Sequence, residues 1–231
     1  MKTLTETDKE YLCDIEAPCF KLLTQAEIEQ VQASKTQVLF RKGENLTKQG
    51  AFASYVLFIV TGLAKQFIEG EGNRSFSLRI VKPGEFLGLS AVFGVNTFNY
   101  SSLALIDTLA FLVEKQAVSA LINNDGRFAF NIIKRYCEQN TILFNTVHKL
   151  AYKQMNGRLA ETLLYLSPED YTGEKIFSLL TRKDIAEFAG ISTESTVKIL
   201  KNFEKDGLIA LKDKEIIIKD RSRLIDISRR G

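Results

Sequence analysis

Between Thr193 and Lys205 the apolar and polar positions alternate with the period of a helix. One apolar stripe falls at i, i+3, i+4 and i+7, and it consists of Thr196, Ile199, Leu200 and Phe203. Ser192 can cap this helix by accepting a hydrogen bond from a free backbone N–H. The opposite face presents side chains that can contact base edges and phosphates, namely Glu194, Ser195, Lys198 and Lys201. A solvated surface helix with a Glu194–Lys198 pair fits this pattern as well.

The segments on either side of this helix favour the DNA-binding interpretation. Leu180–Ala189 reads as a preceding helix that is capped by Thr181, and 190–192 is a tight turn that begins with glycine. Asp206 and Gly207 end the second helix, and the apolar runs 208–211 and 215–218 flank a polar turn, as in a β-hairpin. Helix, tight turn, helix and hairpin predict a winged helix-turn-helix.

From Gln37 to about Val113 the pattern changes to short apolar runs separated by turn residues. The clearest runs are 38–40, 55–60, 64–68 and 76–81, with turns that contain Gly43, Gly62, Gly70, Gly72 and Gly84. Several strands at this spacing predict an antiparallel barrel or sandwich. The two glycines of 70–72 are interpreted as a hairpin turn and not as a phosphate-binding loop, because no helix follows them.

Two further segments have helical character. Residues 1 to about 36 are acidic, with Leu22, Leu23, Ile28 and Val31 at helical spacing, and they are expected to pack on the strands that follow. A long helix is predicted from Arg127 to Gln154, after which Gly157 is expected to end or bend the chain.

The predicted long helix carries an a/d seam of the coiled-coil type. Its positions alternate by three and four and are Phe130, Ile133, Cys137, Asn140, Phe144, Val147 and Ala151. Such a seam favours a homodimer, although a helix that packs on its own barrel remains an alternative. Asn140 would be a polar seam residue of the kind that fixes register.

Composition narrows the class of protein only slightly. The chain has 231 residues, 45% of them hydrophobic, and a net charge of +3, which fits two folded domains. Lys175–Gly231 holds 13 Lys and Arg against 9 Asp and Glu, whereas the first thirty residues hold 3 against 7. The N-terminal residues lack the apolar core of a signal peptide, and no apolar run could cross a bilayer, so we expect a cytoplasmic protein.

The order of these parts resembles the Crp/Fnr family of bacterial transcription regulators over almost the whole chain. The stretches that carry the resemblance are Gly43-Glu44, Thr61-Gly62, Pro83–Gly88, Gly157–Leu164 and Thr181–Ile209. The resemblance implies an α+β protein with an N-terminal double-stranded β-helix or jelly-roll barrel, a long dimerisation helix and a C-terminal winged helix-turn-helix. The corresponding divisions are 1–126 for the helical arm and effector domain, 127–154 for the dimerisation helix and hinge, and 155–231 for the DNA-binding domain.

In the family an Arg-Glu pair, followed one turn later by a second Arg, reads a TGTGA-like half-site. These positions hold Thr193, Glu194 and Lys198 here. Glu194 can accept from a cytosine amino group and Lys198 can donate to guanine, whereas Thr193 removes one guanine reader. The operator half-site is therefore expected to be related but different. The full predicted DNA-binding set is Thr181, Arg182, Ser192, Thr193, Glu194, Ser195, Lys198 and Lys201.

The sensory half departs further from the cyclic-AMP-binding members. The predicted effector pocket consists of Gly88, Leu89, Tyr100, Ser101, Leu143 and Phe144. The family's ribose-binding Glu and phosphate-binding Arg are replaced by Leu89 and Tyr100, and the base-binding Thr and Ser by Leu143 and Phe144; only Ser101 is retained. A buried cyclic phosphate without a cation costs several kcal/mol, so tight cyclic-nucleotide binding is not expected. Either a less charged effector binds, or these side chains fill the pocket themselves.

A redox cofactor is not expected. Cys13 and Cys19 match part of the cysteine pattern of the oxygen-sensing members, but Glu10 and Phe111 stand where two further cluster ligands are expected, and Cys137 lies on the dimer helix. The single histidine, His148, lies outside the predicted barrel, which argues against haem and a His-rich metal site. No catalytic residue, metal or cofactor is therefore predicted.

We expect a homodimeric, sequence-specific transcription regulator that binds a palindromic operator in double-stranded DNA. Its effector is unidentified, and a contact with RNA polymerase through residues 167–175 is possible. The alternatives are a β-barrel enzyme or ligand-binding protein, and an interaction adaptor that has lost specific DNA binding. The sequence offers no nucleophile–base pair, metal cluster or phosphate-binding loop to support an enzyme.

Overall fold

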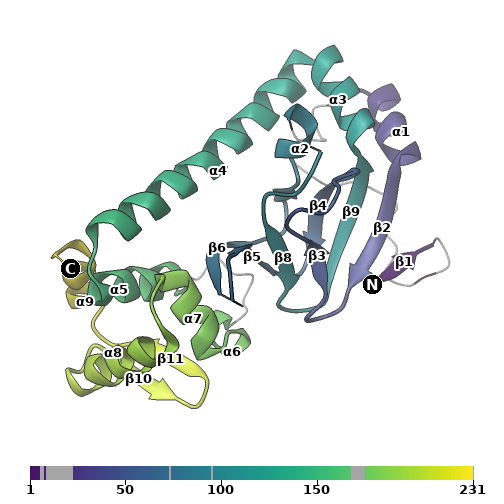
Figure 1. Ribbon diagram of the computed structural model, residues 1–231. Coiled ribbons are helices and arrows are strands. Elements are labelled where there is room, and N and C mark those ends of the chain that lie inside the picture. The colour runs from purple at the N-terminus through teal and green to yellow at the C-terminus, as the bar shows by residue number, and fades with distance from the viewer. Residues whose placement is uncertain (6–7, 9–22, 73, 95, 168–174, 231) are drawn as a thin grey trace. The chain divides into compact units, whose positions relative to one another are not determined.

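The computed structural model describes residues 1–5, 8, 23–72, 74–94, 96–167 and 175–230. They form two compact units, drawn together in Figure 1. The first unit contains Met1–Glu69 and Ile80–Ile142, and the second contains Gly70–Arg79 and Leu143–Gly231. None of the helices in the described ranges combines the length and the apolar character that crossing a bilayer requires.

Two antiparallel sheets build the first unit. The five-stranded sheet has the order β1 (Lys2–Leu4), β2 (Lys35–Phe40), β9 (Thr108–Glu114), β4 (Tyr55–Thr61) and β7 (Phe86–Leu87). The four-stranded sheet has the order β3 (Asn45–Thr47), β8 (Ser101–Ala104), β5 (Ala64–Glu69) and β6 (Ser75–Val81). Gly70–Arg79, which includes the β5–β6 turn and most of β6, belongs to the second unit. We call the two sheets the β-roll.

An apolar core lies between the two sheets. Phe40, Leu57 and Ile59 come from the five-stranded sheet, and Ala64 and Ala104 come from the four-stranded sheet. Because one cluster takes side chains from both sheets, the sheets pack face to face, and the predicted jelly-roll architecture is confirmed.

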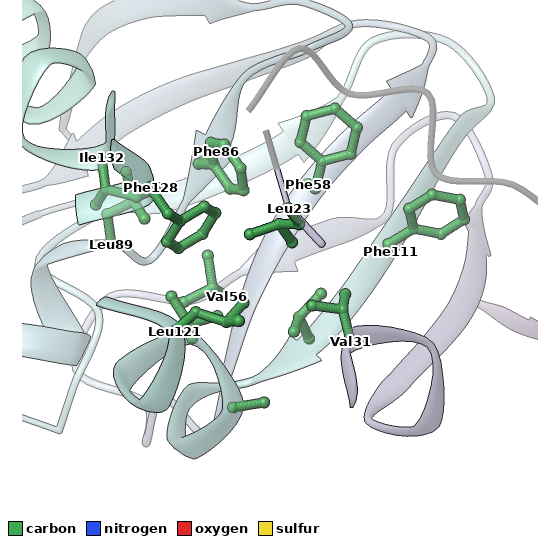
Figure 2. Close-up of a cluster of buried hydrophobic side chains, with 13 residues drawn as sticks. Leu23, Val31, Val56, Phe58, Phe86, Leu89, Phe111, Leu121, Phe128 and Ile132 are labelled. Carbon is green, nitrogen blue, oxygen red and sulfur yellow. The ribbon is translucent and has the colours of Figure 1, made fainter. Parts of the chain in front are cut away.

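Strand β4 is apolar over most of its length because both of its faces are buried. Leu57 and Ile59 point into the core between the sheets, whereas Val56 and Phe58 belong to a second cluster on the outer face. Figure 2 shows this second cluster. Helices α1 (Gln25–Ala33), α3 (Lys115–Asn124) and the first turns of α4 (Gly126–Tyr152) contribute to it, through Val31, Leu121, Phe128 and Ile132 among others.

The N-terminal arm departs from the sequence-based expectation. Lys2–Leu4 form strand β1, not a helix, and pair antiparallel with Gln37–Leu39 of β2. The exposed edge of β2 offers backbone donors and acceptors that a three-residue strand satisfies, and this gain overrides local propensity. The predicted helix is confirmed only over Gln25–Ala33, and residues 9–22, with Cys13 and Cys19, lie outside the described residues.

The predicted long helix is confirmed as α4, but the break after it was placed wrongly. The helix ends at Tyr152, and α5 (Met155–Tyr165) begins two residues before Gly157, which is buried inside α5. Arg158 explains the position of the break, because its guanidinium donates to the carbonyls of Leu150 at 2.9 Å and Lys153 at 2.8 Å. These bonds satisfy carbonyls that the end of a helix leaves free.

The second unit contains the predicted winged helix-turn-helix. Its elements are α6 (Ile176–Leu179), α7 (Arg182–Ala189), α8 (Thr193–Lys205), β10 (Ile209–Lys212), β11 (Glu215–Ile218) and α9 (Arg221–Arg230). Strands β10 and β11 pair antiparallel from Ile209↔Ile218 to Lys212↔Glu215, which confirms the predicted wing. Helix α9, which packs on α5, was not predicted.

Candidate nucleic-acid interface and effector segment

Helix α7 starts at a capping box, as expected for Thr181. The Thr181 hydroxyl accepts from the backbone N–H of Asp184 at 3.1 Å, and the Asp184 carboxylate accepts from the backbone N–H of Thr181 at 2.7 Å. Two backbone donors that the helix start would leave free are therefore bonded. This reciprocal pair fixes the direction in which α7 enters the domain.

The turn between α7 and α8 depends on Gly190. Its φ of +63° lies in the left-handed region, and a Cβ placed there would lie 2.7 Å from Leu150 Cδ2 and 3.1 Å from a ring carbon of Phe76. Only glycine fits both this backbone conformation and this close approach. The tight turn is therefore held by backbone shape and by packing together.

Helix α8 has the predicted start and the predicted buried face. Ser192 caps it, because its hydroxyl accepts from the backbone N–H of Ser195 at 3.0 Å. The four residues of the apolar stripe, Thr196, Ile199, Leu200 and Phe203, are all buried. The opposite face of α8 is therefore exposed on the surface of this unit.

Four residues of the predicted DNA-binding set are exposed on α8, namely Thr193, Glu194, Lys198 and Lys201. Ser195 is only half-exposed, and its hydroxyl is bonded to that of Ser192 at 2.9 Å. Within the described part of the chain, no ion pair joins Glu194 to Lys198. Both side chains can therefore extend toward a ligand without first breaking a mutual contact.

The wing turn lies beside the start of α7. The guanidinium of Arg182 is 3.4 Å from the carbonyl oxygen of Asp213, and partial burial lowers the pKa of Arg182. Asp213 adopts a positive φ of +51°, which turns the chain between β10 and β11. Lys212 and Lys214 flank it and are exposed. These two lysines were not in the predicted set, although their place in the polar hairpin turn could have suggested them.

In the β-roll the predicted effector segment is engaged by the protein itself. Gly88 has a φ of +84°, and its backbone N–H donates to the phenol oxygen of Tyr100 at 2.7 Å. A Cβ on Gly88 would lie 2.9 Å from the Phe98 ring and 3.2 Å from the Tyr55 carbonyl oxygen, so this position requires glycine. Leu89 is 1% exposed and belongs to the outer cluster of the β-roll, as labelled in Figure 2.

Ser101 takes part in a different network. Its hydroxyl accepts from the backbone N–H of Gln49 at 2.9 Å and donates to the carboxylate of Glu69, which also pairs with Lys48 at 2.6 Å. The hydrogen bond from Lys48 lowers the pKa of Glu69 most, and the hydrogen bond from Ser101 lowers it further. Among the predicted pocket residues, Gly88 and Tyr100 are joined by a hydrogen bond. Leu143 and Phe144 belong to the second unit and are exposed.

The predicted dimer seam runs along the exposed side of α4. Phe130 is 68% exposed, Ile133 53%, Phe144 75% and Val147 63%. Cys137 and Ala151 are exposed and Asn140 is half-exposed. Phe128 and Ile132, by contrast, are buried against the β-roll. The helix therefore packs on its own domain through one face and leaves a second apolar face uncovered.

Phe111, which stands where a cluster ligand is expected in oxygen-sensing members, is 1% exposed within an apolar cluster and offers no ligand atom. Glu10, Cys13 and Cys19 lie outside the described residues.

Comparison with known proteins identifies a known domain in each half of the chain. Residues 37–125 match the model of the cyclic nucleotide-binding domain, and residues 157–227 match that of the Crp-like helix-turn-helix domain. The CRP-like cAMP-activated global transcriptional regulator of Mycobacterium tuberculosis is 23% identical over 80% of this chain and 84% of its own.

Solved structures show the same fold. A protein described as a Crp/Fnr-family transcriptional regulator from Eubacterium rectale superposes with a TM-score of 0.77 at 19% identity, over 92% of this chain and 98% of its own. FixK2 from Bradyrhizobium japonicum superposes with a TM-score of 0.73 at 21% identity, over 84% of this chain and 96% of its own. With both domain models matched in order, the chain belongs to the Crp/Fnr family of transcription regulators, which are DNA-binding proteins and not enzymes.

Proposed function

We propose that this regulator binds a palindromic operator as a homodimer and reads each half-site mainly through Glu194 and Lys198. The observation that carries the proposal is the exposed face of α8. Glu194 and Lys198 are one helical turn apart, exposed and not paired with each other, and the buried stripe behind them fixes their direction. A carboxylate can accept from the amino group of cytosine, and an ammonium can donate to guanine.

The other residues of the predicted set would position the helix. Arg182 at the start of α7, Lys201 on α8 and the wing lysines Lys212 and Lys214 are suited to phosphate contacts. Thr181 and Ser192 cap the two helices. The positive end of each helix dipole favours a neighbouring phosphate. Thr193 offers one short hydroxyl where relatives carry an Arg, so the half-site should differ at that base pair.

The homodimer is supported by the uncovered seam on α4. Large apolar side chains that are more than half exposed along one face of a 27-residue helix lose contact with water only when a partner covers them. A second copy of the chain offers the same seam, which suits two-fold pairing. Two recognition helices related by that axis would face two inverted half-sites.

The cellular setting follows from the proposed function. A regulator of this kind acts in the cytoplasm, where the DNA is, and has RNA polymerase as its possible partner. The loop expected to touch the polymerase, residues 167–175, is described only at Ser167 and Lys175.

The test begins with selection of the preferred operator from a pool of random duplexes. Binding of the selected and of a scrambled duplex is then compared by gel retardation at about 150 mM salt, where non-specific contacts weaken. We expect the Glu194→Ala/Lys198→Ala variant, whose net charge is unchanged, to bind both duplexes equally while its dimer mass is retained. Unchanged preference for the selected duplex in this variant would refute the assignment of these readers.

The interaction adaptor is the second candidate, because Thr193 and Lys198 are weaker readers than arginine. It predicts that the wild-type protein enriches no sequence from the random pool. Enrichment of an inverted repeat would exclude it.

A further inference from the structure

We propose that Tyr100 is a built-in occupant of the effector segment, so that this regulator adopts its DNA-binding form without a bound ligand. The proposal deepens the function proposed above, because it concerns the regulation of the same protein. It starts from the contact between the phenol oxygen of Tyr100 and the backbone N–H of Gly88.

Three backbone donors of the segment are already used. Gly88 donates to Tyr100 at 2.7 Å, Ala91 donates to the carbonyl of Gly88 at 3.0 Å, and Val92 donates to the carbonyl of Leu89 at 3.1 Å. An anion bound at the start of this short helical turn would need such N–H groups as donors. To reach the Gly88 N–H, it would first have to displace the phenol of Tyr100.

The space around Gly88 is filled as well. The Phe98 ring lies where a Cβ of Gly88 would come within 2.9 Å of it, and Tyr100 packs at the edge of the core between the two sheets. Leu89 points into the outer cluster with Phe86 and Phe128, and it therefore presents no polar atom to a ligand. Figure 2 shows Leu89 beside Ile132 and Phe128 of α4.

The one polar residue retained from the cyclic-nucleotide pattern is also engaged. Ser101 is fully buried, and its hydroxyl bonds to Gln49 and Glu69. Binding a cyclic phosphate at this hydroxyl would bring a second negative charge close to the carboxylate of Glu69. The two negative charges would repel each other, so the hydrogen-bond network of Ser101 disfavours an anionic ligand.

These observations share one consequence. Through its hydrogen bond to Gly88, the Tyr100 side chain joins the segment that begins at Gly88 to the start of β8 from within the chain. The group that occupies the segment is therefore a side chain of the protein itself. Its presence there does not depend on the concentration of a metabolite.

The decisive variant is Tyr100→Phe, which removes the phenol oxygen and keeps the ring. The first readout is amide hydrogen exchange of the full chain, followed at Gly88. We expect protection at Gly88 in the wild type and about tenfold faster exchange in Tyr100→Phe, since one partly buried hydrogen bond is lost. Tyr152→Phe serves as the matched control, because Tyr152 is 78% exposed at the end of α4, and it should leave the exchange rate of Gly88 unchanged.

The second readout is binding to the selected operator by protein that has been unfolded, dialysed and refolded to remove small molecules. We expect the wild type to bind without additive, cyclic AMP to leave its affinity unchanged, and Tyr100→Phe to bind at least about fivefold more weakly. A wild type that binds only after a cell extract or cyclic AMP is added would overturn the proposal.

Unprotected Gly88 in the wild type, or equal protection in Tyr100→Phe, would also overturn it. The two readouts separate this proposal from the function on which it rests. If no duplex is bound selectively, the DNA-binding function fails and the claim of ligand-free DNA binding fails with it. The exchange rate of Gly88 still decides whether Tyr100 occupies the segment.

Discussion

The side-chain ammonium of Lys149 donates a hydrogen bond to the backbone carbonyl of Phe188 at 2.7 Å. Lys149 lies near the end of α4 and Phe188 near the end of α7, so the bond ties α4 to the helix-turn-helix. The same ammonium lies 5.7 Å from the centre of the Phe76 ring. Burial lowers the pKa of Lys149, because removal from water disfavours the charged form.

We expect Lys149→Met to weaken operator binding more than it weakens the fold. Methionine keeps the apolar stem and removes both the hydrogen bond and the desolvation penalty of the charge, so the free energy of unfolding should change by less than about 1 kcal/mol. Operator affinity should fall several-fold, because α7 loses its tie to α4. Thermal unfolding and gel retardation measure the two effects. Lys42→Met, at an exposed lysine of the β-roll, is the control, and an equal loss of affinity there would contradict the prediction.

Gly190 and Gly207 offer a matched pair of substitutions. Both have positive φ, +63° and +74°, but a Cβ meets Leu150 at 2.7 Å in the first and nothing within 4 Å in the second. Gly207→Ala should therefore lower the free energy of unfolding by about 1 kcal/mol, the cost of the left-handed conformation. Gly190→Ala should cost clearly more, because Leu150 or the helix-turn-helix must shift. Chemical denaturation measures the free energy of unfolding of both variants. Equal decreases would show that the side chains around Gly190 can move aside at no cost.

Lys198 and Lys201 should separate base reading from phosphate contact. Lys198→Ala should reduce discrimination at one base pair by about 1–3 kcal/mol, because a base contact is lost. Lys201→Ala should weaken binding to selected and scrambled duplexes alike and reduce the slope of log K against log salt by about 1. Titrations at several salt concentrations test this, and sequence-dependent loss in Lys201→Ala would reverse the two roles.

A charge in the α4 seam should dissociate the dimer. Phe144→Glu places a carboxylate at a seam position that is 75% exposed in the single chain and would be buried by a partner. We expect the dissociation constant of the dimer to rise at least about tenfold in sedimentation analysis. Asn145→Glu adds the same charge to the adjacent exposed position outside the a/d pattern and should leave the dimer intact.

The start of α4 should make the stability of the β-roll sensitive to acid. The Asp125 carboxylate accepts from the side chain and the backbone N–H of Arg127, and these bonds lower its pKa. A lowered folded-state pKa gives stability that is complete above the unfolded-state value and is lost as the pH falls through the folded-state value. Asp125→Asn should therefore flatten the stability profile below about pH 4 and change its shape little above pH 5. Denaturation across this pH range provides the measurement.

The parts that the sequence predicted correctly are those in which local chemistry and burial agree. Ser192 and Thr181 are good caps, and the stripe from Thr196 to Phe203 has only one face that can be buried, so α7 and α8 could be placed closely. The apolar run of β4 was recognisable because covering both of its faces leaves no polar position to interrupt it.

The errors arose where a distant residue decides the local structure. Strand β1 forms because β2 offers an open edge, and α4 ends where Arg158 reaches its carbonyls. Helix α9 buries few side chains, chiefly Leu224 and Ser228, so its periodicity is weak. At its start, the carboxylate of Asp220 accepts from the backbone N–H of Arg223 at 2.9 Å. The bond between Gly88 and Tyr100 joins positions twelve residues apart, and no periodic pattern could reveal it.

Helix α4 packs on the β-roll through Phe128 and Ile132, whereas its seam residues lie on a different face. In the proposed dimer, substitutions in the seam would therefore change which copy the chain pairs with, without unfolding the domain that carries it. A duplicated gene could diverge at Phe130, Ile133 or Phe144 and soon stop forming mixed dimers with its parent. Because the seam and the face that packs on the β-roll are separate, a few seam substitutions would be enough for two related regulators in one cell to form only their own homodimers.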